Sequence, residues 1–226
     1  MNVLKSKSNN INLIFIISDL KLLSGYSKIK SAFVNPKKAL IYLFLGKEKF
    51  HALRNLSEHS CFLIEPSSSL ELYMTHPTDI HEHIQTLHLL TIELNLKNIL
   101  ELGTRTGEST IALLLAAKEI NGKVTSIDID SCQEAKEKVE KLDLKSHWNF
   151  IQTDDLEMEW DDQIDHLFID TSHTYDQTLA ELEKFEPLVR KGGLISLHDI
   201  ISCPPVLRAI DDYISKRNDI KFYKFV

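Results

Sequence analysis

The sequence has little cysteine, and basic residues are not in excess. Its three cysteines, Cys61, Cys132 and Cys203, lie far apart and lack the C-x-x-C spacing of zinc sites and redox pairs. This pattern indicates reduced thiols in a cytoplasmic protein. Lys and Arg total 26 against 33 Asp and Glu, which gives a net charge of -7. Because nucleic-acid binding depends on basic residues that neutralise phosphates, the acidic balance disfavours nucleic acid as a partner.

Long hydrophobic runs are missing as well. The apolar run from Leu13 to Ile17 is too short to span a bilayer, and no small-residue cleavage site follows it. It therefore predicts a buried strand or a helix end, with no membrane partner. At 226 residues and 43% hydrophobic, the chain fits one main domain with a smaller appendage.

Glycine is scarce before residue 100 and more frequent after it, so tight turns concentrate in the second part of the chain. We expect residues 1–77 to form a mostly helical extension, in which Pro36 opens one helix. Residues 78–226 are expected to form the main domain, which begins with an amphipathic helix after Pro77 and Thr78.

From Asn98 onward, short apolar runs alternate with helical stretches, which predicts an α/β fold with a doubly wound, mostly parallel sheet. Ligands of such sheets bind beyond the carboxyl ends of the strands. The expected strands are Asn98–Leu102, Lys123–Ile129, Trp148–Gln152, His166–Asp170, Leu194–His198 and Ile220–Val226. The expected helices between them are Glu108–Ile120, Cys132–Leu142, Tyr175–Val189 and Pro205–Lys216.

The first informative segment, Asn98 to Thr110, is a strand that runs into a glycine-bracketed turn and then a helix. Gly103 permits a close backbone approach, and Gly107 lets the helix begin near the strand, with free N–H groups at its start. Arg105 occupies the position of the middle glycine of the dinucleotide fingerprint, where a bulky residue obstructs a pyrophosphate. The turn therefore favours a nucleotide-like cofactor without phosphates.

Acidic residues follow the next two strands. Asp128 lies about 20 residues after the turn, the offset at which an acid meets ribose hydroxyls in doubly wound nucleotide folds, so we expect it to bind ribose. Asp130 is better placed to cap the following helix. Asp154 is expected to accept a hydrogen bond from an adenine amino group, although a solvated acidic loop explains this residue equally well.

This ordered set of residues resembles the class I S-adenosylmethionine-dependent methyltransferases, whose first motif ends in an acid-x-glycine pattern like Glu101-Leu-Gly103. The resemblance spans roughly residues 78–226. It implies S-adenosylmethionine as the cofactor and a small molecule as the methyl acceptor. It also implies cofactor contacts from Glu101, Gly103, Thr104, Gly107, Ser109, Asp128 and Asp154.

Two later segments, Leu167 to Tyr175 and Leu188 to Asp199, narrow the resemblance to a metal-dependent branch of small-molecule O-methyltransferases. That branch includes macrolide-sugar and rhamnosyl methyltransferases and a cephalosporin-biosynthesis protein. By this resemblance Asp170 and Asp199 map onto metal-binding acids, and His173 maps onto the catalytic base. The implied acceptor is a hydroxyl group of a sugar or another small metabolite.

Elementary geometry supports a metal at this place. Neighbouring parallel strands lie about 4.8 Å apart, so carboxylates that end two adjacent strands, such as Asp170 and Asp199, can reach one Mg²⁺. A bound ion lowers the pKa of a substrate hydroxyl and aims it at the sulfonium methyl. His173 lies close enough in sequence to take the proton, because imidazole titrates near neutrality.

The sequence departs from this branch in three respects. Thr171 stands where a glycine often follows the first acid, and the second metal pair reads His198-Asp199 where several members have two acids. Imidazole is a poor ligand for Mg²⁺ but a good one for Fe, Zn or Cu, so the divalent metal, with Mg²⁺ preferred, stays open. His198 either joins the metal site, hydrogen-bonds a ligand or braces the strand end.

The third departure concerns the end of the sheet. The sequence stops at Val226, after the sixth expected strand, whereas class I methyltransferases usually add a seventh, antiparallel strand. The open edge leaves three alternatives: a partner subunit in a homo-oligomer, a rearranged edge, or a shortened family member.

Two other functions stay open from the sequence: an iron-dependent oxygenase that uses His173, His198 and Asp199, and a non-catalytic protein that keeps the fold as an interaction or sensing module. A further group of histidines precedes the main domain's first strand. We interpret it as a solvated or cap-forming face, because on one helix His81 and His88 share a side that His83 does not.

Overall fold

The computed structural model describes residues 12–16, 70, 72–73, 77–81, 83–215 and 217–224. Residues 1–19 and 73–226 form one compact unit, and residues 20–72 form a second. The sheet, its helices and the candidate site all belong to the first unit. The helix expected after Pro36 lies outside the described residues.

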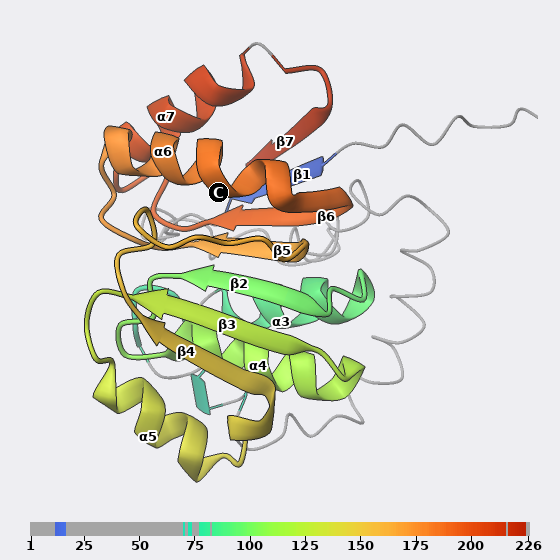
Figure 1. Ribbon diagram of the computed structural model, residues 1–226, viewed down its shortest axis with the longest axis vertical. Coiled ribbons are helices and arrows are strands. Elements are labelled where there is room, and N and C mark those ends of the chain that lie inside the picture. The colour runs from blue at the N-terminus through green and yellow to red at the C-terminus, as the bar shows by residue number, and fades with distance from the viewer. Residues whose placement is uncertain are drawn as a thin grey trace, which may run out of the picture. The chain divides into compact units, whose positions relative to one another are not determined.

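The first unit is built on a seven-stranded sheet with the strand order β4-β3-β2-β5-β6-β1-β7, and all neighbouring strands are parallel. Figure 1 shows the strands side by side, with the arrowheads of β2, β3, β4 and β6 pointing the same way. The strands are β1 (Asn12–Ile16), β2 (Asn98–Leu102), β3 (Lys123–Asp128), β4 (Trp148–Gln152), β5 (Ile164–Ile169), β6 (Val189–Leu197) and β7 (Ile220–Lys224). The helices are α3 (Ile84–Glu93), α4 (Glu108–Ile120), α5 (Gln133–Lys141), α6 (Tyr175–Phe185) and α7 (Pro204–Ile214), with 3₁₀ turns at Lys145–His147 and Glu186–Leu188.

The doubly wound α/β fold expected from the sequence is confirmed, and three elements have the predicted bounds: β2, β4 and α4. Two predictions need correction, because α6 ends at Phe185 and not at Val189, and β6 begins at Val189 and not at Leu194. Pro187 has no N–H group to continue the helix, so the chain passes through a 3₁₀ turn. β6 then begins at Val189, and the register of its pairing with β5 shifts between Ile164 and His166.

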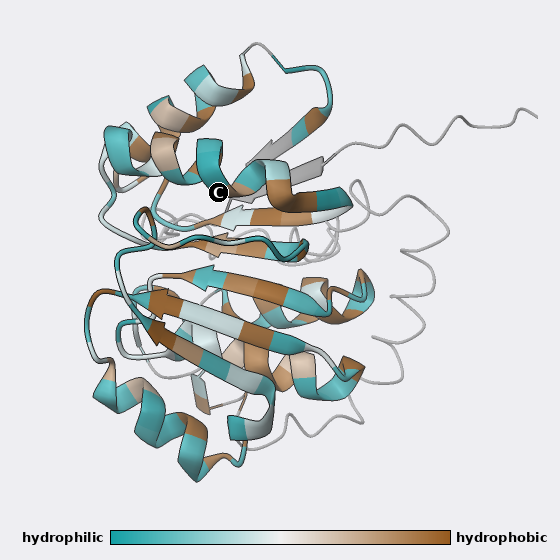
Figure 2. Ribbon diagram, in the orientation of Figure 1, coloured by the Kyte–Doolittle hydropathy of each residue, from teal (hydrophilic) through white to brown (hydrophobic). Residues whose placement is uncertain are grey.

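The core is formed by the apolar residues of the central strands and of the helices that cover them. Parallel strands that are buried on both faces carry nearly continuous apolar sequence, and β2 and the second half of β6 follow this rule. Figure 2 shows brown, hydrophobic residues concentrated in these strands, whereas α5 is mostly hydrophilic. The fully buried core residues from three strands include Leu100, Leu102, Leu167, Ile195 and Leu197, with Phe185 from α6.

The N-terminal strand β1 occupies a position between β6 and β7. Leu13 pairs with Leu194 of β6 on one side and with Lys221 of β7 on the other. The apolar run near the N-terminus is therefore a strand, as one of the two expectations had it. This finding corrects the placement of the whole segment 1–77 in a helical extension, because residues 12–16 belong to the sheet.

The same strand answers the question of the open edge. The rearranged edge, one of the three alternatives, is what the structure shows, since β1 fills the place between β6 and β7 with a parallel strand. Among the described residues, none of the helices combines the length and apolar character that crossing a bilayer requires.

The strand register brings the carboxyl ends of the central strands to one level. Leu102 at the end of β2 pairs with Ile127 of β3 and with Ile169 of β5, and Ile169 pairs with Leu197 of β6. The ladder continues one residue further, where the backbone N–H groups of Gly103, Asp170 and His198 donate to carbonyls of neighbouring strands at 2.9, 2.9 and 3.1 Å. Residues from three separate segments are thus fixed in one row.

Candidate functional site

The turn after β2 requires glycine at two positions. Gly103 has φ +87°, and a Cβ atom there would lie 2.0 Å from the carbonyl oxygen of Asp170. Gly107 has φ +89°, and a Cβ atom there would lie 2.7 Å from Cβ of Ala135 in α5. The first glycine lets the turn approach the end of β5, and the second lets α4 start close to α5.

Glu101 stabilises this turn through hydrogen bonds in the protein interior. Its side chain is fully buried, and its carboxylate accepts hydrogen bonds from the hydroxyls of Ser109 at 2.7 Å, Thr110 at 2.8 Å and Ser126 at 2.5 Å. Burial raises the pKa of Glu101 to about 7, although the three hydroxyl donors oppose this rise. Its oxygens thus join β2 to β3 and to the first turn of α4, and its role in cofactor binding stays a prediction.

Asp128 closes the turn from the side of β3. Its Oδ2 atom accepts the backbone N–H groups of Thr104 at 2.8 Å and Arg105 at 3.0 Å, and its Oδ1 atom accepts that of Asp130 at 2.9 Å. Partial burial raises the pKa of Asp128, but these N–H donors outweigh it and hold the pKa below its ordinary value. The residue stays ionised, and a carboxylate has lone pairs left for further donors.

A small polar pocket lies between this turn and the end of β5. It is lined by Asp79, Ile80, Gly103, Thr104, Arg105, Thr106, Glu108, Ser109 and Asp170. The hydroxyl of Thr104 is buried and has no hydrogen-bond partner among the described residues, which leaves it available for a ligand. Arg105 donates from Nη1 to Asp79 at 2.8 Å at the exposed rim of the pocket.

The predicted adenine ligand, Asp154, lies in the exposed loop after β4. Its Oδ1 atom accepts the N–H of Leu156 at 2.8 Å, and it does not line the pocket. Its role in adenine binding stays a prediction. The neighbouring Asp155 is the buried acid, and its carboxylate contacts Gln177 of α6 at 3.0 Å.

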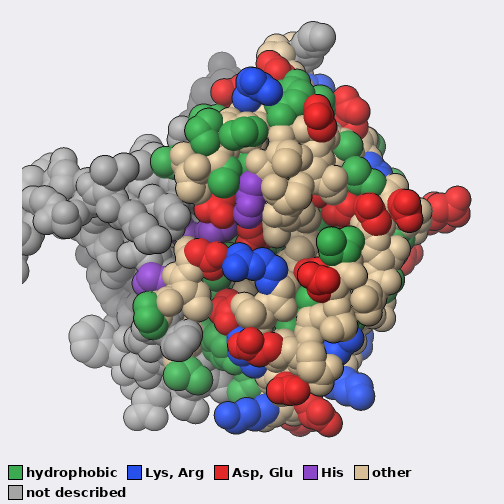
Figure 3. Space-filling view, turned by 90° about the vertical axis from the view of Figure 1, so that its left-hand side faces the viewer, with side chains coloured by type: hydrophobic (Ala, Val, Ile, Leu, Met, Phe, Trp, Pro, Cys, Tyr) green, Lys and Arg blue, Asp and Glu red, His purple; other side chains and the backbone are tan. Residues whose placement is uncertain are grey.

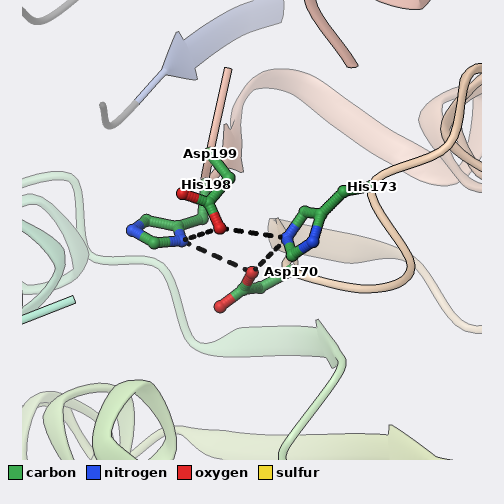
Figure 4. A group of neighbouring side chains, drawn as sticks. All are labelled: Asp170, His173, His198 and Asp199. Carbon is green, nitrogen blue, oxygen red and sulfur yellow. Dashed lines mark hydrogen bonds and ion pairs between the residues drawn. The ribbon is translucent and has the colours of Figure 1, made fainter. Parts of the chain in front are cut away.

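Four side chains that the sequence singled out meet at the carboxyl ends of β5 and β6: Asp170, His173, His198 and Asp199 (Figure 4). One donor atom from each lies within 4.8 Å of those of the others. Nε2 of His173 is 3.1 Å from Asp170 and 3.2 Å from Asp199, and Nδ1 of His198 is 3.4 and 3.3 Å from the same carboxylates. Each carboxylate thus faces both imidazoles.

The local backbone of this cluster is unusual. His173 has φ 56° and Asp199 has φ 58°, a left-handed conformation that non-glycine residues seldom adopt. Such strain is typical of functional sites, where the surrounding structure holds it in place. Ser202 helps to hold Asp199, because its hydroxyl donates to Oδ1 of that carboxylate at 2.6 Å.

The electrostatics of the cluster are strongly coupled. Burial lowers the pKa of His198, but Asp170 and Asp199 outweigh it and raise the pKa to about 10. The hydrogen bond to Asp170 raises the pKa of His173, while both imidazoles lower the pKa of the carboxylates. The side chain of His173 is 26% exposed and that of His198 is 0% exposed, so His173 is the imidazole that an incoming molecule can reach.

These residues fit a divalent cation. The donor atoms stand 3.1–3.4 Å from their neighbours, and ligand atoms about 2.1 Å from a shared ion have separations of about 3.0–3.4 Å. Neither ring nitrogen of the buried His198 has a hydrogen-bond partner among the described residues. Nδ1 is the nitrogen that faces Asp170 and Asp199, at 3.4 and 3.3 Å, and a cation held by the three side chains would lie among these atoms.

The interpretation of His83 as part of a solvated or cap-forming face was wrong, because the residue is buried beside this site and its side chain makes no cap hydrogen bond. Its ring lies edge-on against that of His198, with centroids 5.9 Å apart and an angle of 69°, and only 6% of its surface is exposed. The residue comes just before α3. The helical periodicity of this segment does not indicate which residue His83 contacts. Figure 3, viewed onto the carboxyl ends of the strands, shows histidine and acidic side chains gathered beside a basic one at the central hollow.

Comparison with known proteins agrees with this arrangement. Residues 100–200 match the model of a methyltransferase domain family. The chain is 32% identical over 126 residues to tapetum-specific methyltransferase 1 of Arabidopsis thaliana, a match that covers 51% of this chain and 52% of that protein. It therefore spans about half the length of this relative.

Solved structures share the fold. An O-methyltransferase from Bacillus cereus in complex with SAH matches with a TM-score of 0.53 and 22% identity, over 72% of this chain and 82% of that one. The O-methyltransferase TomG from Streptomyces achromogenes, in complex with SAM, matches with a TM-score of 0.51 and 16% identity, over 80% and 83%. The resemblance to class I methyltransferases inferred from the sequence is confirmed, and at these identities the structural matches show the fold alone.

Proposed function

We propose that this chain, which carries a methyltransferase domain with the class I fold, transfers the methyl group of S-adenosylmethionine to a hydroxyl of a small acceptor with the help of a divalent metal. One observation carries the proposal: the pocket at the glycine turn is also lined by Asp170, a member of the Asp–His cluster. A donor held by the turn therefore stands directly beside residues able to activate a hydroxyl.

The donor half of the site is supported by the shape and charge of the turn. Gly103 and the orphaned hydroxyl of Thr104 leave room and a polar contact for the cofactor, and Asp128 offers remaining lone pairs to ribose hydroxyls. Acidic groups nearby, with Asp170 in the pocket wall, attract the positive sulfonium. Ile129, 69% exposed beside Asp128, offers an apolar surface for a purine ring.

The acceptor half uses the cluster. Asp170, Asp199 and His198 would hold the divalent ion, which when bound lowers the pKa of an acceptor hydroxyl and orients it. His173, the imidazole that solvent reaches, takes the proton of that hydroxyl. The oxygen then attacks the methyl carbon, and the sulfonium leaves as the neutral thioether.

We extend the proposal to the setting of the reaction. Small hydroxylated metabolites, including sugars, are the acceptor class, and the net charge of -7 disfavours nucleic acid as an acceptor. Cys132 and Cys203 are free thiols, which supports a reducing compartment such as the cytoplasm. A homo-oligomer is not needed to cover β6, because β1 already pairs with it. Light scattering tests the oligomeric state.

Donor turnover tests the function. The protein is incubated with S-adenosylmethionine, a divalent ion and a panel of hydroxylated sugars and phenols, and S-adenosylhomocysteine is quantified. We expect product with at least one acceptor, and about 100-fold less with His173→Ala, because a positioned general base contributes about 10²–10⁴-fold. His147→Ala, whose ring contacts the carbonyl of Gly122 at the opposite end of the sheet, is the control and should retain the rate. Equal rates for the two variants would contradict the assigned role of His173.

A further inference from the structure

The cluster at the ends of β5 and β6 contains both nitrogen and oxygen atoms that can bind a cation. We infer that Asp170, His198 and Asp199 select a late first-row divalent ion, such as Zn²⁺, Co²⁺ or Fe²⁺, over Mg²⁺ because His198 is one of the ligands. The inference deepens the proposed function and rests on it for the presence of a metal. It assigns the choice of ion to one side chain.

His198 has the position of a ligand rather than of a strand brace. It follows β6 directly, and its backbone N–H is fixed to the carbonyl of Ile169 at 3.1 Å. Its side chain is 0% exposed, and neither ring nitrogen finds a hydrogen-bond partner among the described residues. Nδ1 instead faces both carboxylates, at 3.4 Å from Asp170 and 3.3 Å from Asp199 (Figure 4). A bracing histidine would have its nitrogens satisfied, as His166 has with Thr91 and Ser196.

The surroundings keep the ring of His198 in place. His83 packs edge-on against it at 5.9 Å, and both rings are buried. The buried imidazole therefore keeps Nδ1 toward the two carboxylates, where an ion held by them meets a nitrogen donor.

This nitrogen donor separates the metals. Mg²⁺ prefers oxygen ligands and keeps several waters, whereas imidazole suits Zn²⁺, Co²⁺ and Fe²⁺. Two carboxylates and one imidazole make a mixed set of the kind that late first-row ions occupy, and Nδ1 of His198 faces both carboxylates at 3.4 and 3.3 Å. With an acid in place of His198, the set would be all oxygen and suited to Mg²⁺.

Metal titration of chelator-treated protein tests the inference without any acceptor. Zn²⁺, Co²⁺ and Mg²⁺ are titrated by calorimetry, and Co²⁺ binding is also followed by its visible absorption. Because most sites bind Zn²⁺ more tightly than Mg²⁺, the decisive quantity is how the Zn²⁺-to-Mg²⁺ affinity ratio changes in His198→Asp and His198→Asn. We expect this ratio to fall by at least about tenfold in both variants, since removal of a nitrogen ligand weakens the late ions selectively. His147→Asn, distant from the cluster, should keep the wild-type ratio.

The outcomes are separable from those of the proposed function. S-adenosylhomocysteine binding, measured on the same samples, reports the donor site, so a protein that binds this ligand but shows an unchanged ratio in both variants overturns the inference alone. Should neither variant fold, X-ray absorption of the wild-type Zn²⁺ protein decides. Imidazole scattering in the first coordination shell supports the inference, and a shell of oxygen alone overturns it.

Discussion

Gly103 and Asp170 lie in direct backbone contact, because a Cβ atom on Gly103 would stand only 2.0 Å from the carbonyl oxygen of Asp170. The carbonyl of Asp170 cannot easily move away, because the N–H of the same residue donates a hydrogen bond to the carbonyl of Leu102 at 2.9 Å. One residue of the proposed donor turn and one of the metal cluster are therefore held by the same contact.

The first prediction concerns this contact. Gly103→Ala adds a clash to the strain of a positive φ, so we expect the free energy of unfolding to fall by about 3 kcal/mol or more. Gly192→Ala is the matched control, because Gly192 also has a positive φ (+74°) but its nearest neighbour, an arginine nitrogen, lies 3.8 Å from the added Cβ. It should cost about 1–2 kcal/mol. Urea denaturation measures both, and equal costs would show that the clash is absent.

The second prediction concerns the side chain that closes the turn. Asp128→Asn places an amide where three backbone N–H groups need acceptors, so we expect about 1–2 kcal/mol lower stability. We also expect S-adenosylhomocysteine to bind at least about tenfold more weakly, because the ribose loses a charged acceptor. Calorimetry measures binding, and the exposed Asp130→Asn provides the comparison. Wild-type affinity in Asp128→Asn would remove the ribose role.

The third prediction follows from a buried acid on α6. Glu181 is fully buried and accepts hydrogen bonds from Thr171 at 2.6 Å and Gln177 at 2.9 Å. Burial, with the nearby charge of Asp155, raises its pKa to about 8. The unfolded chain releases this proton near pH 4.5, so between that pH and 8 the folded state binds more protons than the unfolded state. The free energy of unfolding should therefore fall as pH rises through this window.

Glu181→Gln keeps the acceptor oxygen for Thr171 and Gln177 but cannot ionise, so we expect it to flatten this decline by up to about 1.4 kcal/mol per pH unit. Denaturation series from pH 5 to 8 give the slope. Glu183→Gln, exposed on the same helix, should leave the slope as it is in the wild type. An unchanged slope in Glu181→Gln would contradict the assignment of this proton to Glu181.

Much of the fold follows from the sequence alone, for reasons visible in particular elements. Gly103 and Gly107 interrupt apolar runs so sharply that the bounds of β2 and α4 agree with the structure, and an acid follows each of β3, β4 and β5 as expected. The cluster of Asp170, His173 and Asp199 was predictable because acids at the ends of adjacent parallel strands must meet.

Other features depend on contacts that no local pattern contains. β1 pairs with strands nearly the whole chain away, and a short apolar run does not name its partner. His83 joins the site through the packing of the segment before α3, and Glu101 accepts from three hydroxyls that come from two different elements. Tertiary placement, rather than composition, decides these cases.

The fourth prediction tests the place of β1. Ile14 pairs with Ile195 and Phe222 on its two sides, so Ile14→Pro removes a backbone donor inside the sheet. We expect a loss of about 3 kcal/mol or more in the free energy of unfolding, whereas Ile14→Val, which keeps the N–H, should cost clearly less. A thermal melt of Ile14→Pro that matches the wild type would mean that the N-terminal segment does not complete the sheet.

The account depends most on one claim, that the donor and the metal occupy adjoining sites at the ends of β2, β3, β5 and β6. A crystal structure with S-adenosylhomocysteine and Zn²⁺ tests it most directly. We expect the ribose hydroxyls at Asp128, the thioether sulfur on the side of Asp170, and anomalous scattering from zinc among Asp170, His198 and Asp199. Ligand density on another face of the molecule, or zinc bound elsewhere with the cluster unchanged, would contradict it.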